Sequence, residues 1–204
     1  MYDIKEVVVA YPKMQQVSRT HTQAESRPII TFIYPAFPRV FKNIEIVADA
    51  ATLLYDEGIT GFEVLFTIAG GENRYAHHLV DKYKRVPVIS FIGIQSRENI
   101  FTLYQQAHAL IFPSKLETWG LPISEFKCFG KPLLLADLPY AHETVGDYEK
   151  VKFFDPGDPR QLAAYMGSLI KGDLVYDGNR AVPVENPFAR DWDQLFTILL
   201  SSKG

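Results

Sequence analysis

The sequence predicts an α/β fold in which a doubly wound, parallel, Rossmann-like sheet forms one domain. Short apolar runs alternate with helical segments from residue 29 to residue 170, which is the pattern of βαβ units. These runs are mainly apolar and do not alternate with polar residues, as expected of strands buried on both faces. Glycine and polar residues gather where the runs end, at the edge where open parallel sheets bind ligands.

The apolar runs predict strands, and the segments between them predict helices. Strands are expected at residues 29–34, 63–69, 86–92, 109–112, 132–136 and 151–154. Helices are expected at residues 43–55, 74–84, 97–107, 122–129, 141–147 and 158–170. A last amphipathic helix is expected at residues 191–200, with Trp192, Leu195, Phe196 and Leu199 on one face.

The chain divides into three parts. Residues 13–28 are polar and nearly lack apolar side chains, which predicts a loop or tether. We therefore interpret residues 1–28 as an interdomain segment, residues 29–172 as the Rossmann-like domain, and residues 173–204 as a turn-rich segment with the terminal helix.

Composition excludes several classes of protein. With 204 residues and a net charge of −3, the chain is large enough for a core and has no basic footprint for nucleic acid. Its one cysteine, Cys128, rules out an internal disulfide framework, and we expect it to be buried. No apolar run is long enough to span a membrane, and no signal-peptide pattern is present. A cytoplasmic location is predicted. The full enzyme could still work at the inner face of the membrane through parts outside this chain.

The stretch from Ile111 to Pro132 contains the main chemical feature. A short strand ends at Pro113, and Gly120-Leu121-Pro122 begins a helix, because proline suits the first helical turn. The amides from Trp119 to Ile123 are then predicted to point outward as hydrogen-bond donors, with the helix dipole adding positive charge. Gly120 would let a phosphate approach the backbone closely, so the sequence predicts an anion site.

Two carboxylates flank this anion site. Glu117 precedes the helix, Glu125 lies about one turn inside it, and seven residues separate them. A carboxylate does not bind phosphate, but it accepts hydrogen bonds from sugar hydroxyls. An anion flanked by hydroxyls describes a nucleotide-sugar. The alternative interpretation is a loop charge at Glu117 and a dipole partner at Glu125.

The order Phe-Pro-Ser, Glu117, Trp-Gly-Leu-Pro, Glu125, Gly-Lys-Pro resembles the E-x(7)-E signature of retaining GT-B glycosyltransferases, specifically family 4 (glycosyl transferases group 1). The resemblance implies that Glu117 binds the transferred sugar and Glu125 the ribose. It also implies that the backbone between them holds the diphosphate, which involves Thr118, Trp119, Gly120 and Leu121. One departure is Phe126, where the family usually has alanine.

The first βα loop carries two cations, Arg39 and Lys42. Cations at a helix start oppose the helix dipole, which argues against ordinary surface charges. The family has an arginine and a lysine in this loop, and the resemblance implies that both bind the diphosphate and stabilise the leaving group. Arg39 stands closer to the lysine than the family spacing.

Weaker signals lie at two other strand ends. Gly71 could let the backbone approach the nucleotide or simply form a turn. Ile94 stands where the family's base-binding loop lies, and it could pack on the base or in the core. Asp191-Trp192-Asp193 looks like a D-x-D metal motif, but it begins the terminal helix, where acids favour the dipole. We therefore predict no metal ligand and no metal cofactor.

The resemblance implies the donor-binding domain of a two-domain GT-B glycosyltransferase. Its donor would be a UDP-sugar or GDP-sugar, and its acceptor a saccharide or glycolipid bound through a missing N-terminal domain. Family 4 enzymes often act in surface polysaccharide or glycolipid assembly, so the resemblance also implies that pathway. We expect donor binding by this chain, with little or no transfer when it is alone. The alternatives are a nucleotide-sugar epimerase or a sugar phosphorylase of the same fold, or a non-catalytic nucleotide-binding Rossmann domain.

Overall fold

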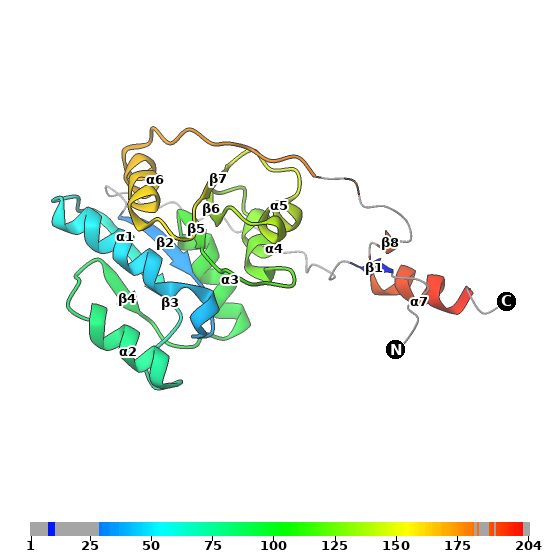
Figure 1. Ribbon diagram of the computed structural model, residues 1–204, viewed down its shortest axis with the longest axis horizontal. Coiled ribbons are helices and arrows are strands. Elements are labelled where there is room, and N and C mark those ends of the chain that lie inside the picture. Colours follow the sequence, from blue (N-terminus) through cyan, green and yellow to red (C-terminus); the bar gives the residue numbers. More distant parts are fainter. Residues whose placement is uncertain (1–7, 11–28, 182, 184–187, 190, 202–204) are drawn as a thin grey trace.

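The predicted doubly wound parallel sheet is confirmed. The computed structural model describes residues 8–10, 29–181, 183, 188–189 and 191–201. Its main sheet has six parallel strands in the order β4-β3-β2-β5-β6-β7 (Figure 1). These strands are β2 (Ile30–Tyr34), β3 (Phe62–Phe66), β4 (Ile89–Phe91), β5 (Ala109–Phe112), β6 (Leu133–Ala136) and β7 (Val151–Phe154).

Helices cover both faces of this sheet. Helices α1 (Ile44–Asp56), α2 (Arg74–Tyr83) and α6 (Pro159–Lys171) lie together, with α1 in contact with the other two (Figure 1). Helices α3 (Arg97–Gln106), α4 (Leu121–Lys127) and α5 (Pro139–Val145) lie in connections that run the opposite way along the sheet, and right-handed crossovers therefore place them on the other face. Because both faces are covered, every residue of β5 and β6 is buried, which explains their unbroken apolar runs.

The order in which strands are added to the sheet reverses between β2 and β5, although these two strands are parallel. From β2 the chain proceeds outward through β3 to β4, and it then returns beside β2 as β5 and proceeds the other way. Buried aromatic rings fill this junction, where Tyr34 meets Phe112 edge to face with centroids 5.6 Å apart. Ligands of such sheets bind at the carboxyl ends of the strands beside the reversal. The loops after β2 and β5 are therefore the ones that matter here.

Several element boundaries differ from those predicted. Strand β3 ends at Phe66 because the next residue, Thr67, bonds the neighbouring loop through its hydroxyl, 3.0 Å from the amide of Ala36. Strand β4 begins only at Ile89, because residues 86–89 form a turn that the amide of Ile89 closes on the carbonyl of Val86 over 3.0 Å, and Pro87 within this turn has no amide to donate. The prediction that Cys128 is buried was wrong. It follows the last residue of α4 and is exposed.

The terminal parts form a smaller unit. Strands β1 (Val9–Ala10) and β8 (Phe188–Ala189) pair in parallel, and α7 (Trp192–Ser201) packs beside β8 (Figure 1). On α7 the predicted apolar face is largely exposed at Trp192, Phe196 and Leu199. The loop predicted at residues 13–28 lies outside the described residues. Among the helices described, none is long and apolar enough to cross a membrane.

Candidate functional site

Lys42 reaches the site through a tight turn after β2. The short 3-10 helix η1 (Val40–Lys42) ends there, and Asn43 follows with a left-handed backbone, φ 55°. Asparagine tolerates that conformation better than most residues. The buried Asn43 amide nitrogen donates to the carbonyl of Pro113, 3.2 Å away, and to that of Pro156, 2.8 Å away. This side chain therefore joins the loops after β2, β5 and β7.

The loops after β2 and β5 are also joined through their backbones. The amide of Lys115 donates to the carbonyl of Phe41 over 2.7 Å, and the Ser114 hydroxyl lies 3.3 Å from the same carbonyl. Buried Tyr34 donates its hydroxyl to the carbonyl of Lys42 over 2.7 Å. Burial raises the pKa of Tyr34, and nearby Glu117 raises it further, so this phenol stays a neutral donor.

Lys42 and Glu117 meet at the point where these loops join. The Lys42 ammonium pairs with the Glu117 carboxylate, and their side chains are only 19% and 13% exposed. The pair lies at the reversal of the sheet, because one residue follows β2 and the other follows β5. A partly buried ion pair of this kind presents both a cation and a carboxylate to a ligand.

The predicted helix start is present at α4. Gly120 precedes the helix with φ 83°, in the left-handed region, and Pro122 lies in the first turn. The amides of Gly120 and Leu121 donate to no group in the described part of the chain. The prediction for Ile123 was wrong, because its amide donates to the carbonyl of Gly120 over 2.9 Å in a tight first turn.

Both the backbone conformation of Gly120 and the atoms around it disfavour a side chain at this position. An added Cβ would lie 3.2 Å from Cδ1 of Ile123 and 3.4 Å from Cε1 of Phe112. We expect Gly120→Ala to lower the free energy of unfolding by about 2 kcal/mol, through left-handed strain plus crowding. The matched control is Gly58→Ala, whose φ of 82° is alike but whose Cβ would meet nothing within 4 Å; about 1 kcal/mol is expected there. Urea unfolding measures both, and equal losses would show that crowding contributes nothing.

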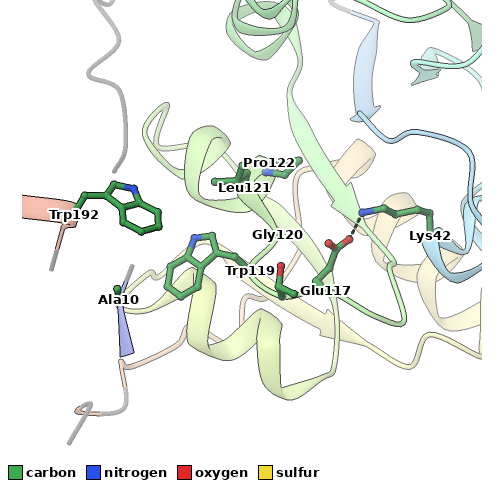
Figure 2. Close-up of a pocket in the computed structure, with 9 residues that line it drawn as sticks. Ala10, Lys42, Glu117, Trp119, Gly120, Leu121, Pro122 and Trp192 are labelled. Atoms are coloured by element: carbon green, nitrogen blue, oxygen red, sulfur yellow. Dashed lines mark hydrogen bonds and ion pairs between the residues drawn. The ribbon is translucent and has the colours of Figure 1, made fainter. Parts of the chain in front are cut away.

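These residues form one pocket. Six predicted site residues line a pocket of about 510 Å³, together with Pro122, Ala10 and Trp192 (Figure 2). The six are Lys42, Glu117, Thr118, Trp119, Gly120 and Leu121. In Figure 2 the indole rings of Trp119 and Trp192 lie at the end of the pocket away from Lys42. The Trp119 ring is fixed by a 3.0 Å bond from its Nε1 to the Ser124 hydroxyl.

Glu125 lies behind the pocket lining, on the side of α4 that faces α3. Its side chain is 11% exposed, and Oε1 lies 3.0 Å from Nη2 of Arg97. The hydroxyl of buried Tyr104 lies 3.4 Å from Oε2. Burial raises the pKa of Glu125, while Arg97 and Tyr104 act to lower it. The carboxylate is therefore held by two donors from one neighbouring helix.

The remaining predicted residues lie apart from that pocket. Ile94 is 68% exposed and lines a second pocket of about 240 Å³ with Phe37 and Thr67, at the ends of β2, β3 and β4. The Arg39 guanidinium lies over the ring of Phe37, 5.5 Å from its centroid. Gly71 is exposed in the loop after β3. Arg39 and Gly71 line neither of these two pockets.

Three residues of this region were missed in the sequence. Tyr104 was not singled out within its expected helix, Trp192 was assigned only to a helix face, and Arg97 only to the start of a helix. The signal for Arg97 was present, because a cation at the first residue of a helix opposes the dipole. The same reasoning selected Lys42. Asp191, part of the D-x-D sequence, accepts from the amide of Gln194 over 2.9 Å and so caps α7.

Two curated relatives resemble the chain over part of their length. O-antigen chain mannosyltransferase B of Escherichia coli is 29% identical over 133 residues, which is 65% of this chain and 34% of the relative. D-inositol 3-phosphate glycosyltransferase of Mycolicibacterium vanbaalenii is 26% identical over 116 residues, 57% of this chain and 25% of the relative. The chain thus spans about a third or less of these relatives.

Solved structures share the fold. Sucrose-phosphate synthase from Thermosynechococcus elongatus superposes with a TM-score of 0.60 at 18% identity, over 73% of this chain and 38% of that protein. Anabaena HepE, solved with UDP and glucose, superposes with a TM-score of 0.58 at 19% identity, over 71% of this chain and 39% of that protein. At such identities the likeness shows the fold alone.

The sequence family described as glycosyl transferases group 1 matches residues 14–184, most of the chain. This match covers the stretch between Ile111 and Pro132 that carries the E-x(7)-E resemblance. The resemblance predicted from the sequence is therefore confirmed at the level of the family, and the chain belongs to the glycosyl transferases group 1.

Proposed function

We propose that this chain is the donor-binding part of a retaining glycosyltransferase that uses a nucleotide-diphosphate sugar. The observation that carries the proposal is the Lys42–Glu117 pair beside the amides of Gly120 and Leu121, at the reversal of the sheet. One pocket thus offers a cation and backbone donors for a diphosphate, and a carboxylate for sugar hydroxyls.

Ligand binding would rearrange the ion pair. Without a ligand, Lys42 is neutralised by Glu117. A diphosphate beside Gly120 would compete for the ammonium, and the carboxylate would turn to the sugar hydroxyls. Glu125, one helical turn further along α4, would accept from the ribose. Arg39 would assist at the diphosphate only by leaving the Phe37 ring.

In transfer, negative charge develops on the departing diphosphate. The amides of Gly120 and Leu121, together with Lys42 once the diphosphate has drawn it from Glu117, would stabilise this charge. We propose that these groups make a metal ion unnecessary. Retention of anomeric configuration is taken from the family. The acceptor, a saccharide or glycolipid, would be bound mainly by the part of the relatives that this chain does not span, so we expect little transfer by this chain alone.

Calorimetric titration tests the proposal. The chain is titrated with UDP, GDP, ADP and their glucose, mannose and N-acetylhexosamine conjugates, with and without EDTA. We expect one base to bind, its sugar conjugate to bind more tightly, and EDTA to change nothing. Glu117→Ala should weaken the conjugate about tenfold, the effect of one lost charged hydrogen bond, and the free nucleotide less than about twofold.

The matched control is Glu57→Ala, which removes an exposed carboxylate beyond the end of α1. It should leave every affinity unchanged. Equal binding of nucleotide and conjugate, with Glu117 dispensable, would instead identify a non-catalytic nucleotide-binding domain. Absence of binding by a folded chain at millimolar concentration would contradict the proposal for this chain.

A further inference from the structure

Arg97 stands where a cation does not stabilise its own helix. It is the first residue of α3, directly after the capping Ser96, whose hydroxyl accepts from the amide of Asn99 over 3.2 Å. Positive charge at this end of a helix opposes the dipole. The side chain is 55% exposed, its guanidinium lies 5.3 Å from the centroid of the Phe101 ring, and its Nη2 reaches Glu125. The ion pair with the Glu125 carboxylate, and not the helix dipole, therefore favours Arg97 at this position.

Glu125 is the buried member of the pair, so its charge depends more on a partner than the charge of Arg97 does. Its carboxylate is largely withdrawn from water, and desolvation favours the neutral acid. The titratable and charged groups that face it are Arg97 at Oε1 and Tyr104 at Oε2, both from α3. On its own helix, Lys127 lies two residues on, but its ammonium is bonded to the carbonyl of Val145 at 2.7 Å. Arg97 is thus the cation that supports this anion.

The two donors also define an orientation. Arg97 and Tyr104 take different carboxylate oxygens, so the plane of the group is set by α3. A carboxylate oxygen accepts more than one hydrogen bond, so both oxygens keep capacity for ribose hydroxyls. The loop before Arg97 carries Ile94, and Gln95 secures this loop by donating to the carbonyl of Ile92 over 2.6 Å. Arg97 therefore links the predicted base loop to the predicted ribose carboxylate.

We propose that Arg97 is a positioning residue that keeps the Glu125 carboxylate ionised and oriented for the ribose of the donor. This rests on the proposed function in one respect, that Glu125 faces a ribose. The link between Arg97 and Glu125 itself does not require a nucleotide. The two parts are therefore separable by experiment.

The first experiment uses no ligand. The side-chain carboxyl carbons are labelled with 13C, the Glu125 resonance is assigned by its loss in Glu125→Gln, and its titration is followed by NMR. We expect Arg97→Gln to move the midpoint of this titration upward, because the ionised form loses its cation. Arg97→Lys should return most of the way toward the wild type, since it keeps the charge but not the planar fork. An unchanged midpoint in Arg97→Gln would overturn the proposal.

The second experiment measures the affinity for UDP, or whichever nucleotide the panel identifies, across pH. Only ionised Glu125 is the strong acceptor, and the ionisation of the ligand's own phosphate affects every variant alike, so each variant is compared with the wild type at the same pH. We expect Arg97→Gln to bind about tenfold more weakly than wild type near pH 6, and within about threefold near pH 8.5. A merely structural defect would weaken binding equally at both values, and that result would also overturn the proposal.

Glu125→Gln supplies the double-mutant test. It preserves shape but cannot titrate, so its weakened binding should keep only the pH dependence that the terminal phosphate of UDP, with a second pKa of about 6, brings to every variant. Adding Arg97→Gln to it should change affinity by less than about twofold, because Arg97 acts through the missing charge. If the wild type binds no nucleotide, the proposed function fails, while the NMR titration still decides the role of Arg97. A large additional loss in the double variant would show that Arg97 contacts the ligand directly and does not act through Glu125.

Discussion

Replacing Lys42 with methionine is expected to weaken the binding of UDP about 10- to 150-fold, the equivalent of one charge-assisted hydrogen bond of about 1.5 to 3 kcal/mol. The ammonium lies in the pocket, 19% exposed, and pairs with Glu117. Methionine keeps an unbranched side chain, one atom shorter, and removes the ammonium with its charge and its N–H donors. The Glu117 carboxylate would then stand beside the diphosphate without its cation, which adds repulsion to the lost attraction.

The measurement is calorimetry with a series of ligands, namely UDP, UMP and uridine. The loss should be largest for UDP and disappear for uridine, because Lys42 is assigned to the diphosphate and not to the base. Lys82→Met is the matched control, since Lys82 is also paired with a carboxylate, 3.3 Å from Asp49, but stands 48% exposed on α2. It should bind all three ligands like the wild type. An equal loss for uridine would show that Lys42 supports the fold of the loop and not the diphosphate.

The second large effect is expected at Asn43. Asn43→Ala should lower the free energy of unfolding by about 3 to 5 kcal/mol, because the Pro113 and Pro156 carbonyls lose their donor in a buried place and alanine is strained at φ 55°. In a domain of this size the melting temperature should fall by about 10 °C. Thermal unfolding followed by circular dichroism measures this.

Asn43→Gly separates the two causes. Glycine adopts φ 55° without strain, so this variant should recover about 1 kcal/mol and retain the loss that comes from the hydrogen bonds. Nucleotide binding should weaken in both variants while they remain folded, because Asn43 holds the loop that ends at Lys42. A stability of Asn43→Ala within about 0.5 kcal/mol of wild type would contradict the assigned role.

Much of the fold follows from local patterns. Mainly apolar runs predicted all six strands, and the two whose runs are wholly apolar, β5 and β6, are the two buried throughout, because residues between two helical layers need apolar side chains on both faces. The start of α4 was visible because left-handed Gly120 and first-turn Pro122 each act through their own backbone. Boundaries were less accurate at β3 and β4. Strand β3 ends where the amide of Ala36 bonds the Thr67 hydroxyl, and β4 begins only after the turn that contains Pro87.

The candidate site was only partly visible. Glu117, Gly120 and Glu125 lie within nine residues, so their proximity follows from one loop and one helix. The residue assigned to the diphosphate from the other loop, Lys42, was selected by resemblance and by its opposition to a helix dipole. The contact of Arg39 with the Phe37 ring was not predictable, because the sequence does not define which neighbours a long exposed side chain contacts.

By itself, then, the sequence determined the strands, the helices and the α4 helix start with its two glutamates, since each depends on periodicity, capping or spacing within a few residues. Only the tertiary structure decided that β5 returns beside β2. This order brings Lys42 to Glu117 across 75 positions and Arg97 on α3 to Glu125 on α4. It also decided that Trp192 of α7 faces the same pocket. The physical reason is that contacts between distant segments depend on how whole elements pack, and the sequence around either residue carries no record of its partner.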